Sequence, residues 1–393
     1  MLDGEPIGFY WGVDPSADSM TIGNLAIAMM VRHFIDHGHK AYLLVGGATG
    51  LIGDPDGKNT ERDLKSADEI ADNKAKITEQ YHKVFAGQAF EQVDNYDWFK
   101  DMGYLSFLRD IGKHVPMRQM LGREFVQNRL GEKGAGISYA EFSYVLIQAY
   151  DFLELHRTHN VSLQVCGADQ WGNCIAGVDL IRRLTGNMAH VWSAPLIVNM
   201  TTGVKFGKSE GGAVWLDAAK TSVYKFYQFW LNVDDVGVES YLKMYTLLSQ
   251  AEIEQTMAEF LQNKGSRAAQ KRLAYEVTSL IHGQVQADKQ KRIAEALVKQ
   301  SLVDLSEAEL ATIREELPTV NLTDSGTDIV TILVSSGLAS SKSEARQLLA
   351  DRAVYVNSIS VEQPQLKDEQ FQDDRLLLRR GKAFRDTVLV ERD

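Results

Sequence analysis

Three polar side chains share one face of a predicted helix that is otherwise apolar. Tyr144, Gln148 and Asp151 stand at i, i+4 and i+7 in the segment Tyr139 to His156. The apolar residues on the rest of this helix need burial against a sheet, so we expect the polar stripe to line a cavity. A phenol, an amide and a carboxylate together can bind a small zwitterion. A solvated helix face is the alternative interpretation.

A turn near the start of the chain has features of a phosphate site. It runs from Gly12 to Asn24 and leads from a predicted strand into a helix, whose first backbone N–H groups favour phosphate. Gly12 and Gly23 would let a nucleotide approach the backbone closely. Ordinary turn chemistry, with Ser19 as the N-cap and Gly23 as a packing residue, explains the segment equally well.

Charged residues follow two further predicted strands. The glycine-rich run Gly46 to Lys58 matches neither the dinucleotide fingerprint nor the P-loop. Within it Asp54 could face a cationic group, while Lys58 and Arg62 could reach anions or simply form a solvated charged loop. Asp169 could accept hydrogen bonds from the two hydroxyls of a ribose, or could cap the helix after it.

A loop between Asn199 and Trp215, which we name the lysine loop, combines glycines with two lysines. Lys205 and Lys208 stand three residues apart among four glycines, and point charges of this kind suit phosphate. Phosphoryl or adenylyl transfer chiefly needs such placed positive charge, because the protein has little covalent chemistry to do. A generic surface loop remains the alternative.

Strands and helices must alternate to bring these segments together. The spacing predicts a strand at Phe9–Asp14, a helix at Ile22–Asp36 and a strand at Lys40–Val45, which form a βαβ unit. The alternation continues through a helix at Trp171–Leu184, with strands at Val161–Val165 and Val191–Val198 on either side of it. The sequence therefore predicts an α/β domain with a Rossmann-like parallel sheet over residues 1–218.

The rest of the chain has a different pattern. Successive amphipathic helices, at Val238–Leu248, Ala251–Leu261 and Arg267–His282, predict an α-helical domain over residues 219–316. The stretch Glu315 to Gly326 is rich in Pro, Thr, Asn and Asp and is interpreted as a linker. A third, small α+β domain is predicted over residues 326–393, with a helix at Ser343–Ala350 and short strands at 354–357 and 359–361.

The composition excludes several classes of protein. With 393 residues, 44% hydrophobic and 24% charged, the chain is neither fibrous nor disordered. No stretch approaches the ~20 apolar residues of a membrane span, and its two cysteines, Cys166 and Cys174, lack metal-ligand spacing, so we expect a reducing cytoplasm and no metal site. A net charge of −11 argues against non-specific coating of nucleic acid but permits a local basic surface.

Taken together, five segments resemble those of bacterial tyrosyl-tRNA synthetases, which are class I aminoacyl-tRNA synthetases. In chain order they are Tyr10–Ser19, Val45–Pro55, Glu141–Asp151, Gly167–Asn173 and Lys205–Ser209. Several are long, and the resemblance extends over nearly the whole chain. It implies a catalytic domain, an anticodon-binding domain and a C-terminal RNA-binding domain of the small-subunit ribosomal-protein type.

The resemblance also implies a role for individual residues. By this resemblance, Tyr10 and Asp151 bind the phenol of the substrate tyrosine. Its ammonium is bound by Asp54, Tyr144 and Gln148. Its carboxylate is bound by Gln170, which Gln164 supports. The ATP set comprises Gly12, Asp14, Gly23, Gly167, Asp169 and Lys208, and the groups acting on the phosphates comprise Ser16, Thr21, Asn24, Lys58, Arg62, Lys205, Lys208 and Ser209. The residues implied to contact RNA are Lys342, Arg346, Arg379, Arg380 and Lys382. The alternative interpretation is that these side chains are solvated surface charges without an RNA partner.

The implied reaction has two steps and needs no protein nucleophile. The tyrosine carboxylate attacks the α-phosphorus of ATP, supplied with Mg²⁺, and the terminal adenosine hydroxyl of tRNA(Tyr) then attacks the mixed anhydride. Catalysis would come from positioning and from charge directed at pyrophosphate. Groups dedicated to the phenol would reject phenylalanine without an editing domain, as the known ~10⁵-fold discrimination of tyrosyl-tRNA synthetases illustrates. The resemblance further implies a cytoplasmic homodimer with tRNA lying across both subunits.

Two departures from the family pattern leave alternatives open. Thr21 occupies a position where relatives usually have a histidine, and relatives usually have a helical segment before the first strand, so we expect a shortened or misassigned start. A weakened paralogue that acts mainly as an RNA-binding or regulatory protein is the second hypothesis. Activation of another aromatic amino acid is the third, and Tyr10 with Asp151 argues against it.

We expect the Thr21→His variant to activate tyrosine faster than the natural chain. A threonine hydroxyl cannot carry charge, and one missing transition-state donor typically costs ~2.7 to 4 kcal/mol. Tyrosine-dependent exchange between ATP and pyrophosphate measures this step, with phenylalanine and tryptophan as controls. Equal exchange rates in the two proteins would show that Ser16, Asn24 and the lysines already compensate.

Overall fold

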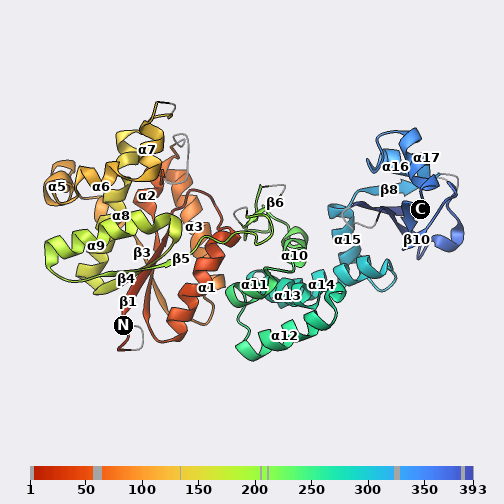
Figure 1. Cartoon of the computed structure of the whole chain (residues 1–393), viewed down its shortest axis with the longest axis horizontal. Coiled ribbons are helices and arrows are strands. Elements are labelled where there is room, and N and C mark those ends of the chain that lie inside the picture. Colours follow the sequence, from red (N-terminus) through yellow and green to blue (C-terminus); the bar gives the residue numbers. More distant parts are fainter. Residues whose placement is uncertain are drawn as a thin grey trace. The chain divides into compact units, whose positions relative to one another are not determined.

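A computed structural model describes residues 4–55, 64–132, 134–203, 206–209, 212–322, 328–381 and 386–392, with the backbone alone at 124–125 and 208–209. These residues form two compact units (Figure 1). The first comprises Met1–Ser222 with Asn232–Leu273, and the second comprises Val223–Leu231 with Ala274–Asp393.

A five-stranded parallel sheet forms the centre of the first unit. Its order is β3-β2-β1-β4-β5. The strands are β1 (Gly8–Val13), β2 (Lys40–Val45), β3 (Phe90–Asp94), β4 (Val161–Gly167) and β5 (His190–Ala194). The chain builds outward from β1 through β2 to β3 and then returns to the other side of β1 with β4. The carboxyl ends of β1 and β4 therefore flank the switch point at which open α/β sheets bind ligands.

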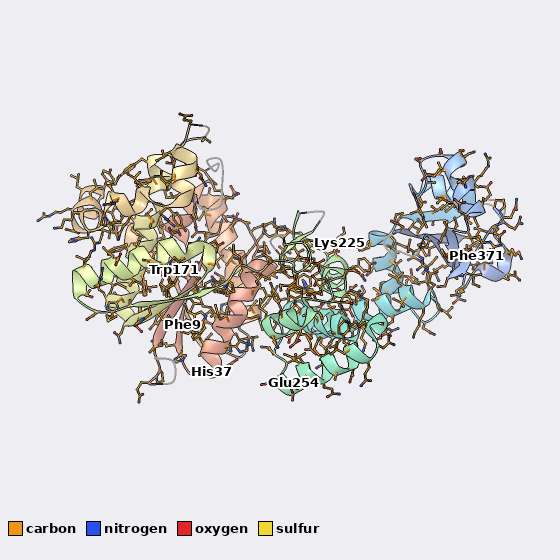
Figure 2. All side chains as sticks on the ribbon, viewed as in Figure 1. Phe9, His37, Trp171, Lys225, Glu254 and Phe371 are labelled. Atoms are coloured by element: carbon orange, nitrogen blue, oxygen red, sulfur yellow. The ribbon has the colours of Figure 1, made fainter. Side chains whose placement is uncertain are left out.

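Helices cover both faces of this sheet (Figures 1 and 2). Successive side chains of β1 point to opposite sides of the sheet and so pack against different helices. On one face Phe9 packs against α1 (Ile22–Asp36) and Trp11 against α3 (Ala67–Val84), with ring centroids 5.3 Å and 5.5 Å from Phe34 and Tyr81. On the other face Tyr10 contacts Phe152 of α8 (Tyr139–His159), beside α9 (Trp171–Thr185).

Shorter elements connect these layers and complete the first unit. They are α2 (Gly47–Ile52), α4 (Tyr96–Phe99), α5 (Tyr104–Asp110), η1 (Gly112–His114), α6 (Met117–Leu121), α7 (Glu124–Leu130), η2 (Ala168–Gln170), the hairpin β6 (Lys208–Ser209) and β7 (Gly212–Ala213), α11 (Val238–Tyr245), α12 (Gln250–Gln262) and η3 (Lys264–Ser266). Among them α11 packs on α1, and its Tyr241 ring stacks on Phe206 with a centroid distance of 4.3 Å. Phe206, which lies within the loop between Asn199 and Trp215, is thereby anchored on a helix.

The second unit joins helices to a small mixed sheet. The helices are α10 (Val223–Leu231), the last part of α13 (Ala268–His282), α14 (Gln284–Lys299), α15 (Glu307–Glu316), α16 (Ile329–Ser335), α17 (Lys342–Ala350) and η4 (Asp368–Gln370). The sheet has the order β10-β9-β11-β12-β8, with β8 (Thr319–Leu322), β9 (Val354–Val356), β10 (Ile359–Ser360), β11 (Arg375–Arg380) and β12 (Thr387–Arg392). Leu377 and Leu389 of this sheet pack into the α14–α15 core.

Most predicted elements of the first domain are confirmed to within a few residues, and the α/β class is confirmed. The strand predicted at Val191–Val198 is shorter, ending at Ala194, because Pro195 follows it. The linker predicted over Glu315–Gly326 is wrong in part. Residues 319–322 form β8, which pairs in parallel with β12, so long-range pairing there outweighs the local turn composition. The division into domains 1–218, 219–316 and 326–393 stays a prediction.

No helix among the described residues is both long enough and apolar enough to cross a lipid bilayer.

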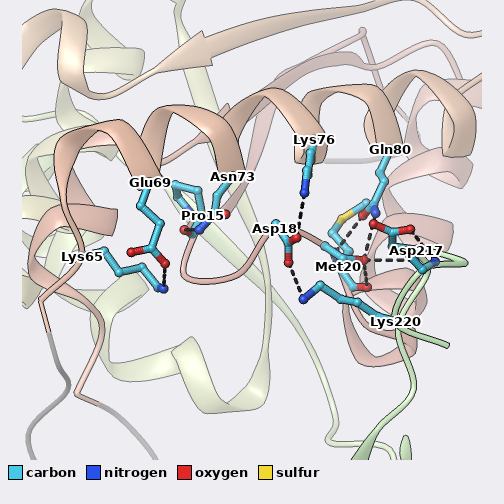
Figure 3. A network of polar contacts seen from close by, with 12 residues as sticks. Pro15, Asp18, Met20, Lys65, Glu69, Asn73, Lys76, Gln80, Asp217 and Lys220 are labelled. Atoms are coloured by element: carbon cyan, nitrogen blue, oxygen red, sulfur yellow. Dashed lines mark hydrogen bonds and ion pairs between the residues drawn. The ribbon is translucent and has the colours of Figure 1, made fainter.

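A polar network holds the turn between β1 and α1 against α3 (Figure 3). Asn73 donates to the Pro15 carbonyl at 2.9 Å, and Gln80 accepts from the Met20 backbone N–H at 2.7 Å. The carboxylate of Asp18 pairs with Lys76 at 2.8 Å and with Lys220 at 2.5 Å. Helix α3 therefore fixes the backbone of the turn in which the phosphate site was predicted.

We expect Asp18→Asn to lower the free energy of unfolding by about 1 kcal/mol at pH 7, allowing for solvent screening of this partly exposed pair. Hydrogen bonds from Lys220 and Lys76 lower the pKa of Asp18 from 3.8 to about 2. A carboxyl group whose pKa is lower in the folded protein than in the unfolded chain stabilises the fold at any pH above its pKa in the unfolded chain. This stabilisation is lost as the pH falls from about 4 towards 2.

Urea unfolding of both proteins between pH 7 and pH 2.5 measures this difference. The exposed Asp72 lies on the same helix, so Asp72→Asn is the control. A difference between Asp18→Asn and the natural chain that does not shrink towards low pH would show that the ion pairs contribute nothing.

Candidate active site

A cavity of about 410 Å³ opens at the carboxyl ends of β1 and β4, on the predicted edge of the sheet. Fifteen of the predicted site residues line it, namely Tyr10, Gly12, Asp14, Ser16, Thr21, Gly23, Asn24, Asp54, Tyr144, Gln148, Asp151, Gln164, Gly167, Asp169 and Gln170. The fold thus brings together side chains that are up to 160 positions apart in the sequence. The polar stripe of α8 faces this cavity, as predicted.

The floor of the cavity contains buried polar atoms that have no hydrogen-bond partner among the described residues. They are the hydroxyl oxygen of Tyr10 and the side-chain carbonyl oxygens of Gln148 and Gln164. Buried polar groups are almost always paired in folded proteins, and an unpaired one costs roughly 1–3 kcal/mol. Their convergence on one cavity indicates a ligand that carries hydrogen-bonding groups.

The carboxylate of Asp151 is 2% exposed and is held by two residues that the sequence analysis did not identify. Asn95 Nδ2 donates to it at 3.1 Å, and Trp98 Nε1 donates at 2.9 Å. Burial raises the pKa of Asp151 well above its ordinary value, although both hydrogen bonds act in the opposite direction. The position of Asn95 directly after β3 was the available signal, and β3 itself had not been predicted.

Asp14 is oriented by hydroxyl groups from two other elements. Thr49 of α2 donates to Asp14 Oδ1 at 2.6 Å, and Tyr144 of α8 donates to Oδ2 at 2.7 Å. Gly46 makes this approach possible, since a Cβ there would lie 2.0 Å from Thr49 Oγ1 and 2.5 Å from Asp14 Oδ1. Burial, followed by the nearby charge of Asp14, raises the pKa of Tyr144 well above its ordinary value, so its phenol stays protonated.

A chain of hydrogen bonds through two side-chain amides leads to Asp54. Gln170 Nε2 donates to Asp54 Oδ2 at 2.5 Å, and Gln170 Oε1 accepts from Asn173 Nδ2 at 3.0 Å. Asn173 Oδ1 in turn accepts from Arg123 Nη1 at 2.5 Å. Neither Arg123 nor Asn173 was assigned a function from the sequence.

At the start of α1, the Thr21 hydroxyl forms a hydrogen bond within the helix cap, and its predicted role at the phosphates stays a prediction. This hydroxyl donates to Asn24 Oδ1 at 2.9 Å, and the Thr21 backbone N–H donates to the same oxygen at 2.9 Å. The Thr21 hydrogen that was expected to reach a phosphate oxygen is therefore engaged within the cap. Asn24 keeps its amide nitrogen as a donor for a ligand oxygen.

The end of the loop between Asn199 and Trp215 is attached to this same cap. Trp215 forms a β-bridge with Thr21, and Ile22 N–H donates to the Val214 carbonyl at 3.1 Å. The predicted phosphate-binding cations Lys58, Arg62 and Lys205 lie outside the described residues, as do the side chains of Lys208 and Ser209.

The predicted RNA-binding residues of the second unit differ in exposure. Lys342 and Arg346 are exposed one turn apart on α17. Arg380 donates to the Leu338 carbonyl at 2.7 Å and pairs with Glu344. Arg379 is not on the surface as expected, because it is 7% exposed and its guanidinium lies 5.3 Å from the ring centroid of Tyr355. Lys382 lies outside the described residues.

Comparisons with known proteins identify one family. The family described as tRNA synthetases class I (W and Y) matches residues 2–299, and the tyrosine–tRNA ligase SYY-like C-terminal domain matches residues 309–384. A solved mitochondrial tyrosyl-tRNA synthetase from Aspergillus nidulans, truncated at its C-terminus, is similar with a TM-score of 0.67 and 32% identity, covering 75% of this chain and 86% of that one.

Curated bacterial proteins are similar over most of the chain. The tyrosine–tRNA ligase of Staphylococcus saprophyticus is 42% identical over 389 residues, which is 97% of this chain and 92% of that protein. Tyrosine–tRNA ligase 1 of Vibrio vulnificus is 45% identical over 357 residues, covering 90% and 84%. This chain therefore belongs to the tyrosine–tRNA ligases, class I tRNA synthetases that join tyrosine to tRNA.

Proposed function

We propose that tyrosine is activated in the cavity at the ends of β1 and β4 and is then transferred to tRNA(Tyr) in a second step. The observation that carries this proposal is the set of unpaired buried atoms of Tyr10, Gln148 and Gln164 on the cavity floor. In the first step the tyrosine carboxylate displaces pyrophosphate from ATP and forms tyrosyl-adenylate. In the second, the terminal ribose hydroxyl of the tRNA takes the tyrosyl group and AMP leaves.

The amino acid fits the cavity with its phenol innermost. The substrate phenol lies between the hydroxyl of Tyr10 and the carboxylate of Asp151. It would give the unpaired Tyr10 hydroxyl a hydrogen-bond partner. It would also bind to the Asp151 carboxylate, to which Asn95 and Trp98 already donate. The substrate ammonium lies among Asp54, Tyr144 and Gln148. Because the Tyr144 hydroxyl donates to Asp14, its oxygen can accept a hydrogen bond from the ammonium.

ATP occupies the part of the cavity nearest α1. Gly12, Asp14, Gly23, Gly167 and Asp169 surround the adenosine, while Ser16 and Asn24 donate to phosphate oxygens. Thr21 contributes mainly by capping the helix. The cations Lys58, Arg62, Lys205 and Lys208, with Ser209, stabilise the charge that develops on pyrophosphate.

Magnesium enters with ATP as part of the substrate. Mg²⁺ usually keeps several waters and binds through substrate phosphates and one or two carboxylates rather than in an all-protein cage. Among the described residues no cluster of three or more His, Cys, Asp or Glu side chains could hold a metal ion. We propose that ATP and tyrosine bind to residues of this chain and that the metal binds to the phosphates of ATP.

The RNA partner is proposed to contact the second unit. Lys342 and Arg346 present two charges from one face of α17 that can pair with phosphates. Arg379 instead stabilises the β-sheet by stacking on Tyr355, and Arg380 fixes the loop at Leu338. The working compartment is proposed to be the cytoplasm, where tRNA is charged.

We expect Tyr10→Phe to reduce the selectivity for tyrosine over phenylalanine by about tenfold, because it removes a hydrogen bond that only tyrosine can accept. The hydroxyl has no partner without substrate, so the variant should unfold at the same temperature or higher. Steady-state exchange kinetics with both amino acids and a thermal melt measure these two effects. If the selectivity for tyrosine over phenylalanine did not change, the phenol of the substrate would not bind at Tyr10.

The active form is proposed to be a homodimer. Tyr104, Leu105 and Tyr139 are 61–78% exposed on the first unit, and the hydroxyls of Tyr104 and Tyr139 lie 3.3 Å apart. An exposed apolar group of this kind is typical of a protein interface.

We expect Leu105→Asp to shift the protein from dimer to monomer, because a charge buried in the interface would be unpaired. Sedimentation equilibrium over a range of concentrations measures the mass. Val285 is equally apolar and 81% exposed on the second unit, so Val285→Asp is the control. A dimer that survives Leu105→Asp but dissociates with the control would move the interface away from α5.

A further inference from the structure

We infer that Arg123 and Asn173 are positioning residues that set the direction of the Gln170 amide, and thereby direct an N–H of Gln170 towards the substrate carboxylate. This inference rests on the proposed role of Gln170. It concerns the chain of hydrogen bonds from Arg123 through Asn173 and Gln170 to Asp54, which we name the amide relay.

The two ends of the amide relay allow one direction alone. An arginine guanidinium has donors and no acceptor, so Arg123 can bond only to the oxygen of Asn173. The nitrogen of Asn173 then faces Gln170 and can bond only to its oxygen, at 3.0 Å. The nitrogen of Gln170 consequently faces Asp54 and donates to its carboxylate oxygen.

The result of this order is a donor in the cavity. The Gln170 amide nitrogen has two N–H groups, and among the described residues Asp54 takes one of them. Because Gln170 lines the cavity, the second N–H is available to a carboxylate oxygen of the amino acid. With the amide turned over, Gln170 would instead present its oxygen, which repels a carboxylate.

Packing holds Arg123 and Asn173 in place. Asn173 is 1% exposed in the first turn of α9. The Arg123 guanidinium lies against Gly172, where a Cβ would come within 2.7 Å of its Nη2 atom. Arg123 belongs to the segment between α6 and α7, which lies outside the sheet. It would therefore affect substrate binding through the neutral side chains of Asn173 and Gln170. Neither Arg123 nor Asn173 is among the residues that line the cavity containing Tyr10.

The test is Asn173→Asp, which keeps the size of the side chain but makes it accept from both neighbours. Gln170 must then turn its nitrogen towards position 173, and its oxygen faces the cavity. We expect the affinity for tyrosine to fall by about tenfold or more, while the affinity for tyramine, which has the same phenol and ammonium but no carboxylate, stays within about twofold. Equilibrium titration of the full chain with each compound measures both affinities.

Variants of Arg123 give a second test if Asn173→Asp folds poorly. Lysine is also a pure donor, so Arg123→Lys should keep the preference for tyrosine over tyramine. Glutamine can donate or accept, so Arg123→Gln should lose part of it. Arg118 is exposed on the adjacent helix α6, and Arg118→Gln removes the same charge without touching the relay.

Gln170→Leu separates the relay from the proposed role of Gln170. If it weakens tyrosine and tyramine equally, Gln170 does not bind the carboxylate and the proposed role fails. If it weakens tyrosine selectively but Asn173→Asp and Arg123→Gln do not, the role stands and the relay is overturned. Equal loss of both compounds in Asn173→Asp would show a merely structural role and would also overturn the relay.

Discussion

The active-site end of the first unit is organised around the buried carboxylate of Asp151. A carboxylate that is 2% exposed must be compensated, and the compensation comes from Asn95 and Trp98, which follow β3. Asn95 also accepts from the Ala48 backbone N–H and donates to Thr49, so the same side chain fixes the start of α2. The hydrogen bonds that compensate this one charge thus join three segments, namely α8, the segment after β3 and the start of α2.

Directional groups then define what the cavity can accept. Thr49 and Tyr144 both direct their hydroxyl hydrogens at Asp14, which leaves the Tyr144 oxygen as an acceptor. The amide relay has the opposite effect at Gln170, where donors are presented. A zwitterion with its ammonium near Tyr144 and its carboxylate near Gln170 matches both. The specificity of such a site follows from the order of donors and acceptors as much as from its shape.

The nucleotide side depends on backbone placement more than on side chains. The turn from Pro15 to Met20 is held from α3 by Asn73 and Gln80, and the cap at Thr21 is bridged to Trp215. The N-terminus of α1 and the end of the lysine loop are therefore parts of one assembly. We expect a change in either to weaken the proposed binding of phosphates, since charge stabilisation requires donors at fixed positions.

The amino-acid sequence by itself determined the class of the fold and most of the cavity lining. Hydrophobic periodicity predicted β1, α1 and β2 almost to the residue, and the i, i+4, i+7 spacing placed Tyr144, Gln148 and Asp151 on one face. Both are local properties of a strand or a helix. Resemblance to a family supplied the roles that spacing alone left open.

Tertiary structure alone decided which partners complete the site. Asn95, Trp98, Asn173 and Arg123 carry no local signal, because their importance arises from contacts with residues 50 to 56 positions away in the sequence. The strand β8 formed within a predicted linker for the same reason, since β12 provides its pairing. Burial likewise removed Arg379 from the surface, and a side chain's exposure depends on the whole fold rather than on its charge.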